Sequence, residues 1–215
     1  MKQFVEKGKT FLLLYVLFAI AGSVIIAVFE HGDEILYANS LHNAFADDLF
    51  KWITRLAEAP AFLLALLFVF FSSYGKGLLL SINLGLVAGM VQLLKLVVFE
   101  GTVRPAVFFE NKVALRFVEG VEIFRHNSFP SGHTAIGFAT FFMLALFTEN
   151  KLRQTLFFVI ALLIGISRVY LLQHFFRDIY AGAFVGVSVT ALFWLTFAQS
   201  NFYNNLTWKD KAVLK

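Results

Sequence analysis

The uncharged segment FLLLYVLFAIAGSVIIAVF, from Phe11 to Phe29, decides which class of fold the chain can adopt. A helix that crosses a bilayer needs about 20 predominantly apolar residues, and this segment is long enough to be one. Three lysines precede it: Lys2, Lys7 and Lys9. A cleaved secretory leader begins in a similar way and ends in small residues such as those at Ala21–Ser23, but its apolar part is usually about 7–15 residues long. The sequence therefore favours a first membrane helix that is retained.

Composition places the rest of the chain in lipid as well. Of 215 residues, 59% are hydrophobic and only 15% are charged, whereas soluble domains carry about a quarter charged residues. The length suits a single domain over residues 1–215, with no room for a large soluble module. The absence of cysteine excludes disulfides and thiolate metal sites. The net charge of +4 is spread along the chain rather than gathered in a patch, so we expect no nucleic-acid partner.

Five further apolar segments follow the first, and two of them, 60–74 and 133–148, need flanking polar residues to complete a crossing. The five are Pro60–Tyr74, Gly77–Phe99, His133–Thr148, Thr155–Leu172 and Ile179–Ala198. Backbone polar groups inside lipid must be satisfied within each helix. We therefore expect an all-α integral membrane bundle of six transmembrane helices.

Six crossings put both termini on one side of the membrane. That side holds nine basic and three acidic residues, and the other side holds nine basic and eleven acidic residues. Three of the outer basic residues belong to the motifs described below. This leaves six basic residues on the outer side against nine on the side of the termini. Because cytoplasmic loops are enriched in lysine and arginine, we expect cytoplasmic termini and a cytoplasmic (inner) membrane location. The connections Glu30–Ala59 and Glu100–Gly132 then lie on the outer, periplasmic or extracellular, face.

The first outer connection contains an amphipathic segment, ADDLFKWITRLAE, from Ala46 to Glu58. Its apolar residues recur at helical intervals behind Asp47 and Asp48, which are candidate N-caps. This pattern predicts a short interfacial helix on the outer face with Trp52 at headgroup depth. Packing of the same helix against the bundle is an equally good interpretation.

The few polar residues near the ends of the spans gather at one predicted edge. Charges inside membrane spans are costly and usually functional. Four separate regions of the chain contribute to this edge, and alternating topology places all four on the outer face. The residues are Lys95, Arg104, Ser131, Gly132, His133, Ser167, Arg168, His174 and Asp178.

These residue types suit the chemistry of a phosphate group. Two arginines and a lysine supply cations, and the arginine fork matches phosphate oxygens bidentately. Ser131 and Gly132 open a helix, where free backbone amides favour an anion. His174 and Asp178 are four residues apart on one helical face, so the carboxylate can hold one imidazole nitrogen and leave the other free as a nucleophile. His133 then remains as a proton donor to a leaving alkoxide.

Each residue also has an ordinary structural interpretation. Lys95 can be a lysine that extends to the interface from a helix end. Arg168 can form a structural ion pair with Asp178, and Pro130–Gly132 can be a turn with a capping serine. A single membrane histidine is more often a satisfied bundle residue than a catalyst. Convergence of all four regions at one depth favours a functional site.

Two of these segments resemble the signature motifs of the type 2 phosphatidic acid phosphatase family, a histidine phosphatase family related to the vanadium haloperoxidases. PSGH, from Pro130 to His133, is similar to the second motif, and SRVYLLQHFFRD, from Ser167 to Asp178, matches every fixed position of the third. The first motif departs from the family pattern of Lys, six residues and Arg-Pro. Here eight residues separate Lys95 from Arg104, and the resemblance covers roughly residues 95–182.

The resemblance implies a metal-independent lipid phosphatase without a cofactor. It implies that His174 attacks phosphorus to give a phosphohistidine, with Asp178 orienting it, and that His133 protonates the leaving group. It further implies that five residues hold the phosphoryl oxygens, namely Lys95, Arg104, Ser131, Gly132 and Arg168. The expected partners are the bilayer and a lipid phosphate such as phosphatidic acid, phosphatidylglycerol phosphate, undecaprenyl diphosphate or a lipid A phosphate. The preferred lipid and the oligomeric state stay open.

Two other functions remain as alternatives. A lipid phosphotransferase uses the same histidine chemistry with another alcohol in place of water. A transporter that binds anions without catalysis needs the same cations, although it has no use for a His–Asp pair. Arg116, Arg125 and His126 are candidates for binding a second phosphate or are ordinary loop charges.

Overall fold

The computed structural model describes residues 2–212, and every extended element of regular structure in that range is a helix. The elements are α1 (Lys2–Val28), α2 (Asp33–Ser40), α3 (Ala44–Arg55), α4 (Ala59–Ser72), α5 (Tyr74–Leu93), the π-helical turn η1 (Leu94–Val98), α6 (Pro105–Phe108), α7 (Gly132–Leu146), α8 (Lys151–Tyr170), α9 (Phe176–Phe193), the π-helical turn η2 (Trp194–Ala198) and α10 (Asn201–Asn204). An isolated bridge joins Val103 to His126. The expected all-α class is therefore confirmed.

Four helices are long and apolar enough to cross a membrane, judged by length and composition. They are α1, α5 with η1, α8, and α9 with η2; α3 and α4 add a fifth span if this bent pair is taken as one. A multi-pass helical membrane protein is thus confirmed. The two shorter predicted spans correspond to α4 and α7, which have 14 and 15 residues, so the six crossings stay a prediction.

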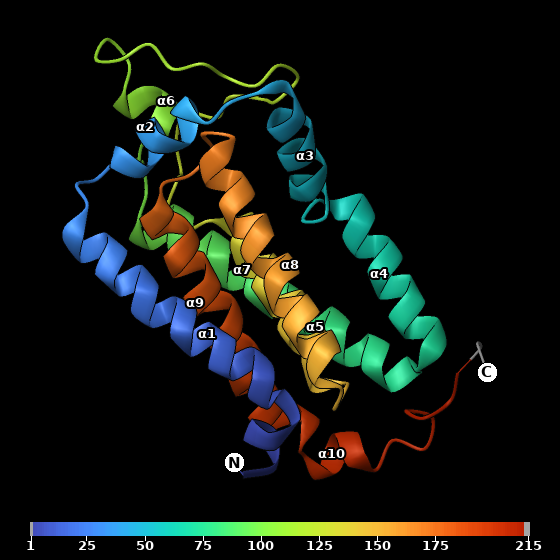
Figure 1. Ribbon diagram of the computed structural model, residues 1–215. Coiled ribbons are helices and arrows are strands. Elements are labelled where there is room, and N and C mark those ends of the chain that lie inside the picture. The colour runs from blue at the N-terminus through green and yellow to red at the C-terminus, as the bar shows by residue number, and fades with distance from the viewer. Residues whose placement is uncertain (1, 213–215) are drawn as a thin grey trace.

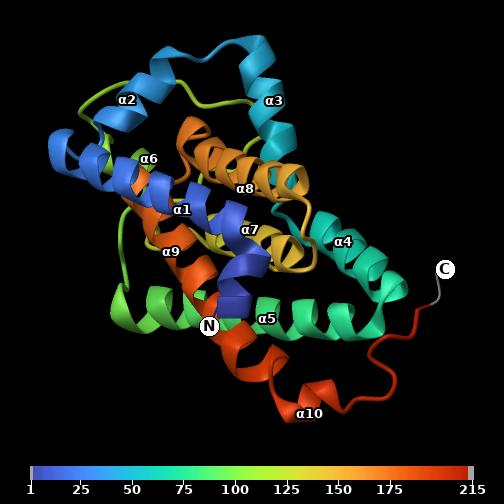
Figure 2. The same ribbon diagram turned by 60° about the horizontal axis from the view of Figure 1, so that its bottom comes forward.

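Helix α7 lies in the middle of the bundle, among α1, α5, α8 and α9 (Figures 1 and 2). Ten of its 15 residues are buried, so most of its surface touches protein rather than lipid. Phe142 stacks on Phe11 of α1 with ring centroids 5.0 Å apart, and Phe138 meets the edge of the same ring at 6.4 Å. Aromatic pairs at such separations add to the energy of area burial. This packing fixes the helix whose first turn carries His133.

The crossing of α7 and α9 depends on glycine. Gly182 and Gly186 are four residues apart, the spacing that lets membrane helices approach closely. A Cβ atom at Gly182 would lie 2.5 Å from the Ser131 carbonyl oxygen, and one at Gly186 would lie 2.3 Å from the Ala135 carbonyl oxygen. At this crossing the Ser131 amide donates a hydrogen bond of 3.0 Å to the Asp178 carbonyl. The two helix starts that carry the predicted histidine motifs are therefore held side by side.

Helix α3 packs against α8. This agrees with the interpretation of residues 46–58 as a helix that packs against the bundle. Phe50 stacks on Tyr170 with ring centroids 4.3 Å apart, and the Tyr170 hydroxyl donates to Asp47 at 2.7 Å. The opposite face is open, since Trp52 is 66% exposed. The N-cap is Asn43, whose side chain accepts from the Ala46 amide; the aspartates proposed as caps lie inside the helix. An interfacial depth for α3 stays a prediction.

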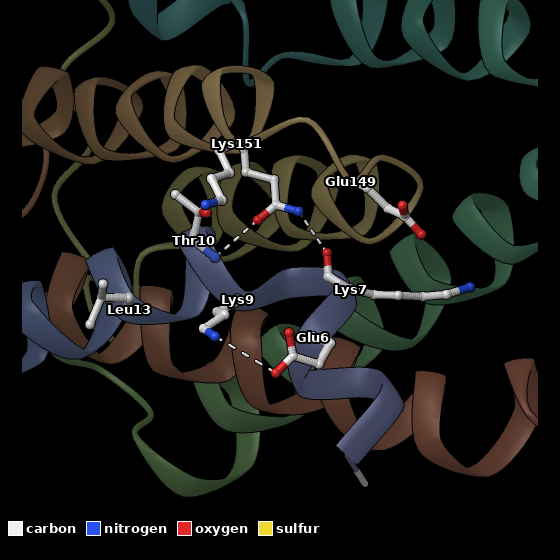
Figure 3. Close-up of a pocket in the computed structure, with 8 residues that line it drawn as sticks. Glu6, Lys7, Lys9, Thr10, Leu13, Glu149 and Lys151 are labelled. Atoms are coloured by element: carbon white, nitrogen blue, oxygen red, sulfur yellow. Dashed lines mark hydrogen bonds and ion pairs between the residues drawn. The ribbon is translucent and has the colours of Figure 1, made fainter.

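The end of the bundle that holds α10 and the start of α1 lies opposite α2, α3 and α6 (Figure 1). A cavity of about 690 Å³ opens there between α1 and the start of α8, and Figure 3 shows its charged rim, including the exposed Glu6–Lys9 pair at 3.7 Å. Below the rim, the buried Gln154 side chain donates to the Lys7 carbonyl at 2.6 Å and accepts from the Thr10 amide at 3.0 Å. A side chain that enters the hydrogen-bond ladder of a helix in this way fastens α1 to α8.

Replacing Gly186 with alanine tests the close crossing. We expect Gly186→Ala to lower the free energy of unfolding by about 1–3 kcal/mol, because overpacking a filled interface forces backbone shifts. The matched control is Gly85→Ala on α5, where a Cβ meets nothing within 4 Å and the change is neutral or stabilises by up to about 1 kcal/mol. Thermal unfolding in detergent measures both. Equal melting temperatures for the two variants would contradict the account of the crossing.

Candidate functional site

The four chain regions that the sequence predicts to converge do meet, at the end of the bundle near α3 and α6. They surround a cavity of about 410 Å³. Its polar lining comes from η1, the loop before α6, the first turn of α7, the last turn of α8 and the connection between α8 and α9. The residues are Lys95, Arg104, Gly132, His133, Arg168 and His174, with Gln92 beside them. Ser131 and Asp178 are buried behind this wall.

His174 presents two different nitrogens to two different environments. Its Nδ1 lies 3.4 Å from Asp178 Oδ2, and its Nε2 lies 3.4 Å from a terminal nitrogen of Arg104. Burial, and then the charge of Arg104, lower the pKa of His174 well below its usual value. The imidazole is therefore neutral at pH 7 and retains a lone pair. With the Nδ1 side occupied by the carboxylate, that lone pair belongs to the nitrogen beside the cavity cations.

The carboxylate of Asp178 is held through one oxygen. Its Oδ2 accepts hydrogen bonds from the Ser128 hydroxyl at 2.5 Å and from the Phe175 amide at 3.1 Å. The second of these caps the start of α9, where a negative charge is favourable. Its Oδ1 has no hydrogen-bond donor among residues 2–212, and the nearest ion-pair contact is Arg177 Nε at 4.0 Å.

Backbone carbonyls hold Arg104 at the cavity. Its Nε donates to the His126 carbonyl at 2.9 Å, and a terminal nitrogen donates to the Gln173 carbonyl at 3.0 Å. The guanidinium also lies 5.0 Å from the centre of the Phe124 ring. Burial lowers the pKa of Arg104 to about 10, so the group stays charged at neutral pH.

Arg168 is held by a helix that the sequence did not connect to the site. A terminal nitrogen donates to Thr54 of α3 at 2.6 Å, and within residues 2–212 its buried Nε has no acceptor. The structural ion pair with Asp178 that the sequence left open does not form. The guanidinium lines the cavity with donor capacity to spare.

Lys95 reaches the cavity despite the lengthened first motif. Its ammonium donates to the Asn127 carbonyl at 2.9 Å. The π-helical turn at Leu94–Val98 and the turn at Gly101, where φ is +74°, take up the extra residues before Arg104. A π-helical turn inserts chain length without ending the helix, and glycine adopts positive φ at no steric cost.

The first turn of α7 combines a cap with free donors. The Ser131 hydroxyl accepts from the Thr134 amide at 3.4 Å and from the Thr134 hydroxyl at 2.9 Å, so its side chain has the capping role that the sequence left open. In the described part of the chain, no acceptor is found for the amides of Gly132 and His133. Such orphan amides at a helix start bind anions. The His133 ring lines the cavity and bonds to no other described side chain.

The arginines considered for a second phosphate already have partners. Arg116 pairs with Asp47 at 2.7 Å and Arg125 with Glu110 at 2.6 Å. His126 contributes its carbonyl to Arg104 while its side chain is exposed. This arrangement favours the interpretation of these residues as ordinary loop charges.

Sequence reasoning missed Ser128 and Thr54. Ser128 stands three residues before Ser131, so its place beside the second motif was a usable signal, but a serine there is typical of a turn. Thr54 lies in α3, far from every motif, and nothing in its local sequence indicates a contact with Arg168. Both contacts join residues at least 50 positions apart.

The matches to known proteins cover the part of the chain that forms this cavity. A family model described as PAP2 superfamily matches residues 75–202. Lipid phosphate phosphatase 1 of Arabidopsis thaliana is 36% identical over 103 residues, which are 42% of this chain and 31% of that protein. The chain thus spans about a third of the length of this relative.

Two solved structures have similar folds over most of this chain. The crystal structure of Aquifex aeolicus LpxE has a TM-score of 0.68 and 25% identity, covering 79% of this chain and 98% of that one. A PAP2-type phosphatidylglycerolphosphate phosphatase from Bacillus subtilis has a TM-score of 0.63 and 23% identity, covering 91% and 98%. The second match shows a shared fold that extends well beyond the motif region.

A Thr54→Val substitution tests whether the hydrogen bond from Arg168 to α3 affects the affinity of the cavity for an anion. Valine removes the hydroxyl at nearly constant volume and leaves Arg168 without this anchor. Hydrogen bonds to charged groups contribute about 1.5–3 kcal/mol, so we expect inorganic phosphate to bind roughly tenfold more weakly by calorimetry. Thr140→Val is the control, since within residues 2–212 that buried hydroxyl bonds only to the Ile136 carbonyl of its own helix, at 2.8 Å. Identical affinities in both variants would contradict this role for Thr54.

Proposed function

The chain belongs to the PAP2 superfamily, and from this membership and the geometry of the cavity we propose that it is a membrane lipid phosphatase that works through a phosphohistidine at His174. The observation that carries the proposal is the orientation of this imidazole. Its Nδ1 lies beside Asp178, and its Nε2 lies at a cavity lined by three cations. That is the arrangement of a nucleophile oriented by a third group.

In the first step, the Nε2 lone pair of His174 attacks phosphorus and the bond between phosphorus and the ester oxygen breaks. His133 gives its proton to the leaving lipid alkoxide. A phosphate dianion in the cavity stabilises that proton on His133 before transfer, since opposite charges favour each other at short range. Lys95, Arg104 and Arg168 stabilise charge on the phosphoryl oxygens, together with the amides of Gly132 and His133.

In the second step, water attacks the phosphohistidine and the bond between nitrogen and phosphorus breaks. His133, now neutral, accepts a proton from the water. Inorganic phosphate leaves, and His174 is again the neutral imidazole that its buried surroundings favour. Asp178 compensates the positive charge that His174 carries between the two steps. In this mechanism Ser131 has no direct contact with phosphate. It contributes by capping α7, whose first turn carries Gly132 and His133.

The cavity wall supports a lipid substrate. Apolar side chains of α4, α5 and α7 continue directly from the cationic groups, so an acyl chain can leave sideways while its phosphate stays at the cations. They are Phe62, Ala88, Val91 and Ile136. The candidate substrates are phosphatidic acid, phosphatidylglycerol phosphate, a lipid A phosphate and undecaprenyl diphosphate. Because Arg116 and Arg125 are already paired, the geometry favours substrates with a single phosphoryl group at the site.

For the membrane topology we propose six crossings, by α1, α4, α5, α7, α8 and α9, within one domain. Both termini are then cytoplasmic and the cavity faces outward. The cysteine-free sequence permits a simple test with Ala114→Cys in the exposed loop beyond α6 and Asn205→Cys after α10. A membrane-impermeant thiol reagent added outside intact cells should label only the first. Labelling of the second alone would reverse the sidedness.

A phosphotransferase and a passive anion transporter are the competing functions. The same histidine chemistry serves a transferase, and a labelled lipid phosphate separates the two by yielding free phosphate or a phosphorylated alcohol. A transporter needs the cations but gains nothing from the buried His174–Asp178 pair. The pair therefore favours catalysis.

Alanine substitutions distinguish the two histidine roles. We expect His174→Ala to release no measurable phosphate from a panel of detergent-solubilised lipid phosphates. His133→Ala should keep a residual rate, lower by about 10²–10⁴-fold, because a general acid contributes that much. His126→Ala is the control, since the backbone carbonyl of residue 126 still accepts the hydrogen bond from Arg104 in this variant. All of the activity should survive a chelator. Equal, mild losses in both histidine variants, or strict magnesium dependence, would contradict the proposed mechanism.

A further inference from the structure

The hydroxyl of Ser128 lies between the two members of the His174–Asp178 pair. Its oxygen is 2.5 Å from Asp178 Oδ2 and 3.4 Å from His174 Nδ1. Ser128 is only 1% exposed and is not among the residues that line the cavity. It therefore contacts the imidazole of His174 from behind, on the side away from the cavity.

Donor and acceptor roles at this contact follow from chemistry. An ionised carboxylate only accepts, so the Ser128 hydroxyl donates to Asp178 Oδ2. The lone pairs of the same hydroxyl then remain for the proton on His174 Nδ1. Nδ1 has two oxygens at equal distances of 3.4 Å, one on Ser128 and one on Asp178, and a proton on Nδ1 would face both. Both acceptors favour the tautomer that leaves Nε2 unprotonated.

Ser128 and the Phe175 amide together hold the carboxylate oxygen that faces the histidine. Every hydrogen bond of the Asp178 side chain within the described residues goes to Oδ2. Oδ1 lies on the other side, with half-exposed Arg177 at 4.0 Å. Without the Ser128 donor, the carboxylate is freer to rotate toward Arg177 and away from Nδ1.

The position of Ser128 is itself fixed by two hydrogen bonds between its segment and Thr102. Its amide donates to the Thr102 carbonyl at 3.1 Å, and the next amide, of Phe129, donates to the Thr102 hydroxyl at 3.1 Å. Thr102 belongs to the loop that carries Arg104. The hydroxyl is thus presented by a segment that is already tied to the cation site.

We propose that Ser128 is a positioning residue that holds the carboxylate of Asp178 and the tautomer of His174 for attack on phosphorus. This role rests on the proposed function of the chain. It predicts an effect on phosphoryl transfer without an effect on phosphate binding, because the groups that line the cavity are unchanged when the hydroxyl is removed.

The test compares Ser128→Ala with wild type in detergent, using a lipid phosphate as substrate and inorganic phosphate as a competitive inhibitor. We expect kcat/KM to fall about 10–100-fold, the range for loss of a hydrogen bond to a charged group. The inhibition constant of inorganic phosphate should stay within about twofold. Ser81→Ala is the control, since among the described residues its hydroxyl bonds only to the Gly77 carbonyl of its own helix, and it should leave both values unchanged.

Ser128→Cys keeps a side chain of similar size with a weaker donor, and its kcat/KM should lie between those of wild type and Ser128→Ala. It replaces the alanine variant if that variant does not fold. An unchanged kcat/KM in the folded variant would overturn the positioning role while leaving the proposed function intact. A parallel loss of phosphate binding would also overturn it, since that result indicates general disruption of the cavity. Absence of phosphate release by the wild type would overturn both proposals.

Discussion

The site depends on the hydrogen bonds of one short segment, residues 126–133, which bonds to Lys95, Arg104 and Asp178. The carbonyls of His126 and Asn127 accept from Arg104 and Lys95. Ser128 bonds to Asp178, and Ser131 caps the helix that begins with Gly132 and His133. Because successive residues of this irregular segment point in different directions, one stretch of backbone can hold cations, a carboxylate and a helix start at once. Motifs that are far apart in sequence are thereby brought to the same cavity.

Electrostatics explains why this segment must be rigid. Three cations line a cavity whose described lining includes no carboxylate, and the acidic partner, Asp178, lies behind His174. Buried like charges repel, and carbonyl dipoles relieve this only in part. Repulsion among the three cations therefore destabilises the cavity without an anion and favours anion binding. The hydrogen-bond donors are already in place before the anion binds, so they need not rearrange. A phosphoryl group that gains charge in the transition state benefits most from such preorganised donors.

Most of the membrane helices and most of the site residues could be predicted from the sequence. The features that could not be predicted have physical reasons. Apolar length and charge identified the membrane helices, and spacing identified His174 and Asp178 as neighbours. The number of crossings was less secure, because α4 and α7 have only 14 and 15 residues, fewer than the roughly 20 that a crossing helix needs. Thr54 and Ser128 were missed because a hydroxyl's partner is set by tertiary packing, which no local pattern records. Ser131 was named from sequence both as a cap and as a phosphate-binding residue, because the two roles look identical there, and the structure shows the cap.

The central claim is that phosphorus is transferred from the lipid to Nε2 of His174, and direct trapping of the intermediate tests it. Enzyme mixed with a lipid labelled in its phosphate is denatured within milliseconds, and the protein is separated from lipid and free phosphate. The account predicts label on His174, stable in alkali and lost in acid, and no label on His174→Ala. Phosphate release by the wild type without protein-bound label, or label on another residue, would contradict it.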